Sequence, residues 1–287
     1  MNIVKSVGVF VLLCIAYSLI VSTVHIKNYQ PLNQFQGNTM AIEDLLYSDL
    51  SGKTNFLVGS SLTYRLRNHF FPNSFQNMAI GGSTSARGLQ KILKKGVAPK
   101  ILLVETNFIS RSNQKGAISA SDRVAAPTAA LKQYLPITRQ KNQPVSFMFN
   151  LLAQEAGLSS SREQPKGERA MAIMMEQQQE VCSKEVFYNE ETYASLQQYQ
   201  ELIGKLQEQG TCIIFMEMPI DCRLAESTLA VSTRAVYRQA FPPDMYQYIT
   251  LPSCEQVTTT DGIHLTAESA KFVAKDIISQ ISKIDCI

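Results

Sequence analysis

The chain has 287 residues, of which 45% are hydrophobic and 18% are charged, and 27 Lys and Arg stand against 24 Asp and Glu. A net charge of +3 over this length does not favour nucleic-acid binding, and the apolar content excludes general disorder. Only one uncharged apolar stretch is long enough to cross a bilayer, which excludes several membrane spans, and the length suits one large domain or two small ones.

The first segment of the chain is apolar. Residues 6–24 carry no charge, and their number matches the roughly 20 residues that a membrane-spanning helix needs. No Ala-x-Ala cleavage pattern follows, which favours an uncleaved signal anchor over a cleaved signal peptide, and the apolar character on all sides disfavours a buried core helix. We therefore expect 1–26 to be a single-pass anchor in the inner (cell) membrane, with Lys5 on the cytoplasmic side and the rest of the chain periplasmic or extracellular.

After a polar linker at 27–40, the chain alternates between two kinds of pattern. Short apolar runs predict strands at 55–59, 75–80, 100–105, 211–218 and 246–251. Amphipathic patterns predict helices at 61–67, 84–95, 192–209, 223–240 and 266–281. Strands that alternate with helices pair in parallel through right-handed crossovers, so the sequence predicts an α/β fold with a doubly wound five-stranded sheet.

An insertion at about 108–190 interrupts this alternation between the third and fourth strands. It is far longer than a usual crossover, and either a helical cap or a mobile surface loop would account for it. Within it, residues 111–169 carry nine Lys and Arg against four Asp and Glu. This excess is either a solvated face or a basic surface that steers an anionic glycan.

Residues with catalytic side chains follow the ends of the predicted strands. They are Gly59-Ser60-Ser61 after the first strand, Gly81-Gly82 after the second, Glu105-Thr106-Asn107 at the third, and Asp261-Gly-Ile-His264 after the fifth. Each has an ordinary alternative as a helix cap, a turn or a loop residue. Because the carboxyl ends of parallel strands meet at one edge of the sheet, we expect the four groups to lie together.

A serine hydroxyl becomes a nucleophile when a neutral imidazole takes its proton and a carboxylate orients that imidazole. The chain has three histidines. His25 lies at the membrane edge, and His69 lies in a segment where a helix-surface or core position is the ordinary explanation. Only His264 has an aspartate, Asp261, three residues before it at the end of a strand. The sequence therefore favours His264 as the base.

The ordered set of strand-end groups resembles the SGNH (GDSL-like) hydrolase family. The resemblance implies a flavodoxin-like sheet, with 41–287 as the hydrolase-like domain and the insertion inside it. It also implies that Ser61 is the nucleophile, with His264 as base and Asp261 as the orienting carboxylate. Oxyanion donors would be Gly82 and Ser61 through their backbone and Asn107 through its side chain. No cofactor and no metal is implied.

The sequence departs from the family pattern in two of its blocks. Ser60 stands in place of the usual Asp, and Glu105 with Thr106 replaces the common Gly-Gly before the asparagine. A Gly-Ser-Ser first block is similar to that of membrane-anchored SGNH-like proteins that serve alginate O-acetylation and teichoic-acid D-alanylation. Ser60, Glu105 and Glu217 are candidates for contacting the substrate, although for Glu217 a solvated strand end is the ordinary alternative.

The expected fold also bears on the cysteines. Export would allow disulfides, and the absence of Cys-x-x-Cys pairs and of Cys/His clusters disfavours a zinc site. Cys222 and Cys254 both follow carboxyl ends of strands, so we expect them to share an edge of the sheet and pair. Cys212 starts its strand at the opposite edge, where the C-terminal helix would bring Cys286. Cys182 would then remain free.

These expectations lead to one main functional hypothesis and two alternatives. The main one is an exported, membrane-anchored serine acyl-esterase or O-acyltransferase that moves a short acyl group, acetyl by preference, on or off a cell-envelope polysaccharide. Transfer would require an integral membrane acyl donor protein as partner. The alternatives are a non-catalytic SGNH scaffold that binds glycan in a modification or export complex, and a lipase or thioesterase.

Overall fold

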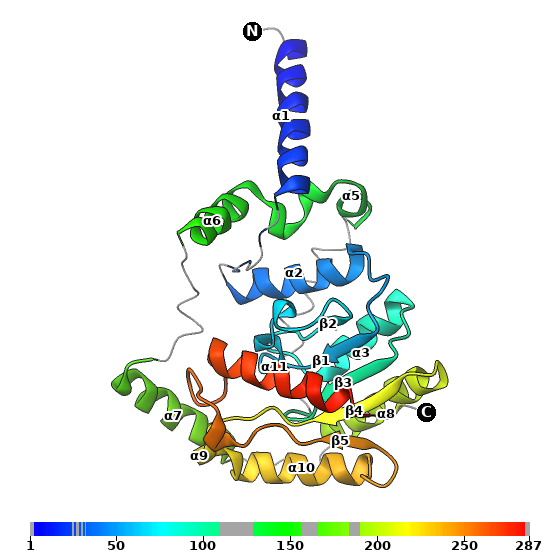
Figure 1. Ribbon diagram of the computed structural model, residues 1–287, viewed down its shortest axis with the longest axis vertical. Helices are drawn as coiled ribbons and strands as arrows, with labels where there is room; N and C mark the ends of the chain where they lie inside the picture. Colours follow the sequence, from blue (N-terminus) through cyan, green and yellow to red (C-terminus); the bar gives the residue numbers. More distant parts are fainter. Residues whose placement is uncertain are drawn as a thin grey trace. The chain divides into compact units, whose positions relative to one another are not determined.

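The computed structural model describes residues 3–24, 26, 29, 31, 33–109, 129–156, 166–183 and 190–284. The chain divides into two compact units, one made of residues 1–49 and 116–159 and the other of residues 50–115 and 160–287 (Figure 1). The long insertion after the third strand is therefore shared between the units. Residues 41–49, which we expected in the hydrolase-like domain, group with the first unit.

The second unit contains a five-stranded parallel sheet. Its strands are β1 (Asn55–Val58), β2 (Phe75–Asn77), β3 (Ile101–Glu105), β4 (Cys212–Met216) and β5 (Gln247–Ile249). Their order is β2-β1-β3-β4-β5, and every neighbouring pair is parallel. This confirms the predicted doubly wound α/β fold, and it places the carboxyl ends of all five strands at one edge.

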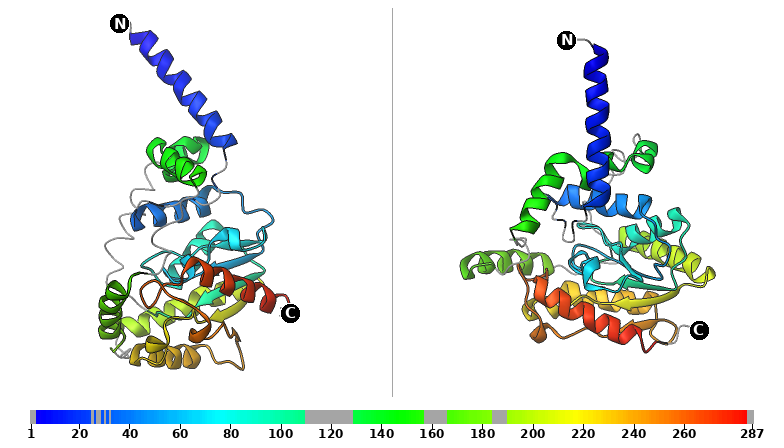
Figure 2. Two further views of the ribbon diagram at one scale, coloured as in Figure 1. Left: turned by 60° about the vertical axis from the view of Figure 1, so that its left-hand side comes forward. Right: turned by 45° about the horizontal axis from the view of Figure 1, so that its top comes forward.

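Helices cover both faces of this sheet. They are α3 (Ser85–Lys95), α8 (Glu190–Glu208), α10 (Thr228–Ala240) and α11 (Ala267–Ile281) (Figure 2). Side chains alternate between the two faces of a strand. Leu57 and Ile214 accordingly belong to the same buried cluster as Val273 of α11. Phe215, the next residue of β4, instead contacts the Tyr237 ring of α10.

Two predicted helices differ from the structure. The helix predicted at 223–240 is two helices, α9 (Cys222–Ala225) and α10, because the Ser227 hydroxyl accepts the Ala230 N–H and starts a new helix. No α-helix forms at 61–67, where the chain makes the 3-10 turns η1 (Thr63–Arg65) and η2 (Asn68–Phe70). The prediction of a helix there was wrong, and the functional site below gives the reason.

One of the expected disulfides lies within the described residues. Cys222 of α9 and Cys254, which begins the 3-10 helix η6 (Cys254–Gln256), are joined as predicted. Cys182 is free and buried, also as predicted. Cys212 is disulfide-bonded, but Cys286, the partner we expected for it, lies outside the described residues.

The first unit is helical. It comprises α1 (Ile3–Thr23), α2 (Gln34–Tyr47), α5 (Ala129–Tyr134), the 3-10 turns η3 (Pro136–Thr138) and η4 (Gln140–Asn142), and α6 (Pro144–Glu155). By length and composition, α1 could cross a membrane, and a signal sequence would pass the same test. Helix α2 begins at Gln34, inside the segment expected to be a linker.

Polar contacts join the helices of the first unit. The Gln36 side chain of α2 donates to the Ser146 hydroxyl of α6 at 2.6 Å, and both residues are buried. The Lys132 ammonium of α5 lies 2.6 Å from the Glu43 carboxylate of α2, again with both side chains buried. The two parts of the sequence that make up this unit are therefore connected by specific bonds.

Candidate active site

Three of the residues predicted from the sequence form a continuous chain of hydrogen bonds at the carboxyl edge of the sheet. The Ser61 hydroxyl follows β1 and lies 2.9 Å from Nε2 of His264. Nδ1 of the same imidazole lies 2.7 Å from Oδ2 of Asp261. When Nδ1–H donates to the carboxylate, Nε2 carries the lone pair that accepts the serine proton. The arrangement can therefore deprotonate Ser61.

The loop before α11 fixes this imidazole. Oδ1 of Asp261 accepts the N–H of His264 at 2.8 Å and that of Ile263 at 3.2 Å, so one carboxylate holds both the ring and its backbone. Gly262 between them has φ +92°, a conformation that L side chains rarely adopt, and a Cβ there would collide with Met175. Met175 belongs to α7 (Glu168–Cys182), so this part of the insertion packs on the loop that holds Asp261 and His264.

Asp261 is ionised more readily than an ordinary aspartate. Its burial raises its pKa, but the hydrogen bond to the His264 ring, the charge of that ring, and the two backbone N–H donors together outweigh burial. The pKa of Asp261 therefore lies below its usual value of 3.8. A charged carboxylate at this position keeps Nδ1 protonated and Nε2 free to act as the base.

Ser60 and Glu105 lie on the inner side of the same turn. Both are buried, and Glu105 accepts four hydrogen bonds. They come from the N–H and the hydroxyl of Ser60 at 2.8 and 2.6 Å, and from the N–H and the hydroxyl of Thr63 at 3.1 and 2.6 Å. Four donors match the lone pairs of an ionised carboxylate. Glu105 is thus fully occupied by the chain's own groups.

This cluster corrects two of the predictions. Ser60 and Glu105 were candidates for contacting the substrate, but their burial and mutual bonding leave no polar atom for that task. The turn itself follows a 3-10 pattern. The Leu66 N–H donates to the Thr63 carbonyl, three residues earlier, and the Asn77 amide of β2 donates to the carbonyls of Thr63 and Leu66. The bonds from the Ser60 and Thr63 N–H groups to Glu105 resemble a helix N-terminal cap, since the first N–H groups of a helix have no intrahelical partner.

The turn that contains Gly82 runs beside the turn that contains Ser61. Parallel pairing continues past the end of β2, where the N–H groups of Met78 and Ile80 donate to the carbonyls of Leu57 and Gly59. Gly82 has φ +75°, which favours glycine at this position. The predicted backbone donor thus lies on the segment next to the serine turn.

Asn107 is held by the backbone beyond β4. Its side-chain oxygen accepts the Met218 N–H at 2.7 Å, and its Nδ2 donates to the Met218 carbonyl at 2.9 Å. An amide nitrogen carries two hydrogens, and the bond to Met218 uses one of them. The other hydrogen is available for an oxyanion, and the side chain is held in one orientation.

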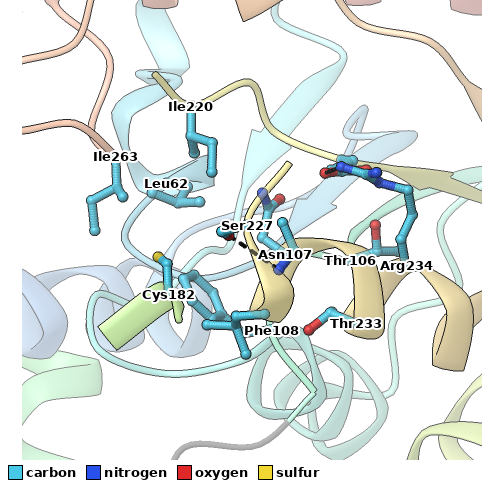
Figure 3. Close-up of a pocket in the computed structure, with 13 residues that line it drawn as sticks. Leu62, Thr106, Asn107, Phe108, Cys182, Ile220, Ser227, Thr233, Arg234 and Ile263 are labelled. Carbon is cyan, nitrogen blue, oxygen red and sulfur yellow. Dashed lines mark hydrogen bonds and ion pairs between the residues drawn. The ribbon is translucent and has the colours of Figure 1, made fainter. Parts of the chain in front are cut away.

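A small pocket opens beside these residues (Figure 3). Leu62 and Ile263, the neighbours of Ser61 and His264, lie with Ile220 on one side of it, and Asn107 also lines it. The space that the centre of a water molecule can occupy is about 30 Å³, enough for about two waters.

The far side of the pocket is polar. Arg234 of α10 donates to both carboxylate oxygens of Glu217, at 2.8 and 3.1 Å, and this hydrogen bonding raises the pKa of Arg234. Glu217 lines the pocket with its carboxylate paired, and its contact with substrate stays a prediction. The Asp221 side chain caps α9 by accepting the Arg223 N–H.

Sequence reasoning missed several residues of this site. Asn77 lies in one of the predicted strands, but its side-chain role in positioning the serine turn shows only in three dimensions. Arg234 and Cys182 reach the pocket from α10 and α7, and no local motif marks them. Knowledge of which helix face packs on the carboxyl edge would have been needed to find them.

Among the described residues, the remaining histidine and the acidic side chains form no second reactive cluster or metal site. His69 is exposed on η2, and His25 lies outside the described residues. Among the residues that the structure describes, no three His, Cys, Asp or Glu side chains gather in a way that could hold a metal ion. The reactive groups that this edge of the sheet brings together are a serine, an imidazole and a carboxylate.

Comparisons with known proteins give a distant structural similarity. No family model and no curated protein matches the chain. One similar crystal structure is that of a protein assigned as an acylhydrolase, from Bacteroides fragilis NCTC 9343. The two chains are 12% identical with a TM-score of 0.46, and the match covers 86% of this chain and 95% of the other. A second is the crystal structure of a GDSL-like lipase from Bacteroides thetaiotaomicron VPI-5482. It is also 12% identical, with a TM-score of 0.39, and the match covers 86% of this chain and 98% of the other. At this level neither similarity carries an argument about activity, which rests on the site geometry.

Proposed function

We propose that the chain is an exported, membrane-anchored serine acyl-esterase or O-acyltransferase that acts on an acylated cell-envelope polysaccharide. One observation carries the enzymatic part of the proposal. The Asp261, His264 and Ser61 side chains form an unbroken chain of hydrogen bonds of 2.7 and 2.9 Å, at the sheet edge where substrates of α/β proteins bind.

The geometry supports a two-step acyl transfer. The Ser61 oxygen attacks the carbonyl carbon of the ester while Nε2 of His264 takes the serine proton. Negative charge then develops on the carbonyl oxygen, where the second N–H of the Asn107 amide and the backbone N–H groups of Gly82 and Ser61 are the proposed donors. His264 returns the proton to the departing alcohol oxygen, which leaves an acyl group on Ser61. A water or a sugar hydroxyl then accepts this group by the reverse steps.

The pocket offers an acyl group an apolar wall, which Leu62, Ile220 and Ile263 form. Acetyl as the group moved rests on the resemblance of the first block to that of proteins that serve O-acetylation. The polysaccharide acceptor and a membrane-bound acyl donor protein rest on the resemblance of the Gly-Ser-Ser first block. The anchor rests on the length and composition of α1.

Covalent labelling tests whether the protein is an enzyme. A serine-directed fluorophosphonate should label the wild-type chain and should not label Ser61→Ala. Ser60→Ala is the matched control, since its hydroxyl is donated to Glu105, and it should keep the label. A wild-type chain that takes up no label would sink the proposal and favour the scaffold alternative.

Product analysis then separates hydrolysis from transfer. The purified full chain is given an acetylated envelope glycan, and acetate is measured in solution. In a parallel reaction it is given an acetyl ester donor with the unacetylated glycan, and ester-linked acetate is measured on the glycan. Release alone indicates an esterase, and acetate on the glycan indicates a transferase. If neither glycan reacts while small acetyl esters are cleaved, the polysaccharide assignment fails.

A further inference from the structure

Helix α6 presents an exposed apolar stripe. Val145, Met148, Phe149 and Leu152 recur at the spacing of one helix face, and their exposed fractions are 79%, 49%, 49% and 63%. The opposite face is covered, because Phe147 and Asn150 are buried and the Ser146 hydroxyl binds Gln36 of α2. A stripe of this kind is what an interfacial amphipathic helix presents to lipid.

Contacts within the first unit place α6 beside the apolar helix α1. The Tyr17 ring of α1 contacts the Phe147 ring of α6 edge-on at 6.0 Å. The Tyr17 hydroxyl donates to the Asn142 carbonyl, two residues before α6 begins, at 2.7 Å. Figures 1 and 2 show α6 beside the C-terminal end of α1.

The position of Tyr17 along α1 sets the depth of this contact. The 21 residues of α1 extend for about 31 Å, close to the thickness of about 30 Å of a bilayer's hydrocarbon core. Tyr17 lies six residues before the end of α1 at Thr23, which is about 9 Å along the axis. Interfacial helices lie about 5–10 Å into the boundary between headgroups and acyl chains. A helix that contacts Tyr17 is therefore at interfacial depth whenever α1 spans.

The covered face of α1 leads to the same conclusion. Cys14, Tyr17, Ser18 and Val21 are only partly exposed, and they form one face of the second half of the helix. The part of α1 that is exposed on all sides, residues 3–13, measures only about 16 Å, which is too short to cross a bilayer. A spanning α1 must therefore take the elements packed on its second half into the membrane boundary.

The charges of this region do not favour an electrostatic attachment. The three basic side chains between 129 and 155 are engaged with α2: Lys132 with Glu43 and Lys141 with Asp44, both at 2.6 Å, and Arg139 over the Tyr47 ring. Helix α6 itself carries no charge before Glu155 at its end. Attraction to the bilayer would then come from apolar burial and would not depend on anionic lipid.

We propose that α6 is a second membrane element, which lies in the lipid interface with Val145, Met148, Phe149 and Leu152 facing the acyl-chain boundary of the bilayer that α1 crosses. The inference rests on the proposed membrane anchoring by α1. The occupant of the stripe is lipid, because the stripe is purely apolar and adjoins a helix whose own surface faces lipid. By fixing the first unit to the bilayer at two points, α6 would limit its tilting about α1.

The absence of tryptophan from the chain provides a direct test. A single tryptophan is introduced by Phe149→Trp on α6, by Phe10→Trp on α1, or by Tyr193→Trp on α8, all at exposed positions. Each full-length variant is reconstituted into phosphatidylcholine vesicles whose acyl chains are brominated either near the headgroup or deep in the chain, and bromine quenching of the emission is measured. We expect quenching and a blue shift for Phe149→Trp and little quenching for Tyr193→Trp.

Each outcome bears on a separate statement. If Phe10→Trp is not quenched by lipids brominated deep in the chains, the anchoring by α1 fails. If Phe10→Trp is quenched and Phe149→Trp is not, the anchor stands and the proposal for α6 is overturned in favour of a protein covering the stripe. Equal quenching of Tyr193→Trp would indicate general adsorption and would also overturn it.

The salt dependence tests the apolar character of the contact. Raising the salt from about 0.1 M to about 1 M shortens the Debye length from about 10 Å to about 3 Å. Quenching of Phe149→Trp should not change with this increase, nor with the addition of anionic lipid. A marked loss at high salt would contradict the apolar mode of binding.

Discussion

Two carboxylates at the carboxyl edge of the sheet act on two neighbouring serines of one turn in different ways. Asp261 is partly exposed and holds His264, whose ring reaches the Ser61 hydroxyl. Glu105 is buried and binds Ser60 directly. The same residue types therefore build a reactive cluster on the open side of the turn and a structural cluster on its inner side.

The contrast between Ser60 and Ser61 shows what decides the role of a serine. The Ser60 hydroxyl donates to Glu105 and accepts the Leu62 N–H, so its proton is committed to a buried carboxylate. The Ser61 hydroxyl faces an imidazole nitrogen, and the next residue, Leu62, lines the pocket. Because Glu105 holds Ser60 inward, Ser61, one residue later, is left to point toward His264.

The largest effect is expected from weakening the reactive cluster at its carboxylate. Asp261→Asn removes the charge that keeps Nδ1 protonated, and we expect kcat for an acetyl ester to fall by about 10⁴-fold. Asp244→Asn, at an exposed position, is the matched control and should retain full activity. A loss of less than tenfold for Asp261→Asn would show that the carboxylate does not orient the base.

A smaller loss is expected when one oxyanion donor is removed. Asn107→Ala should lower kcat by about 10²–10³-fold with little change in KM, because the donor acts mainly in the transition state. Asn107→Asp is the sharper variant, since it keeps an oxygen for the Met218 N–H but offers no N–H. Full activity in Asn107→Asp would exclude the side chain as an oxyanion donor.

The inner cluster should respond in stability rather than in chemistry. Glu105→Gln replaces one acceptor oxygen with a donor, and Ser60→Ala leaves a carboxylate oxygen without its partner. We expect each to lower the free energy of unfolding by about 1–3 kcal/mol, measured by urea unfolding in detergent. Both variants should keep the fluorophosphonate label. A rise in KM with unchanged stability would instead return Glu105 to a role in substrate contact.

The smallest effect is expected on the stability of the fold at acidic pH. The pKa of Asp261 is lower in the folded protein than its ordinary value of 3.8, so the folded state binds fewer protons at this site. The ionised group therefore stabilises the fold above the ordinary value, and the contribution is lost as the pH falls through the lowered value. The stability difference between wild type and Asp261→Asn should shrink below pH 3.8. A difference that is constant with pH would contradict the lowered pKa.

Much of the fold could be predicted from local patterns. The apolar runs marked all five strands, although each strand is one or more residues shorter than its run. The helix predicted at 61–67 failed for a long-range reason. Asn77, from another strand, donates to the Thr63 carbonyl, which a helix would have used, and the Leu66 N–H bonds to the same carbonyl in a 3-10 turn.

The sequence by itself determined the alternation of strands and helices, the four groups at strand ends, and one histidine with an aspartate three residues before it. These features are local, because spacing along the chain sets periodicity, caps and turns. Only the tertiary structure decided that Ser61 and His264, 203 residues apart, lie 2.9 Å from each other. It also decided that Glu105 withdraws Ser60 and that Arg234 lines the pocket. Such contacts depend on strand order and on which helix face packs on the sheet, and no short segment encodes either.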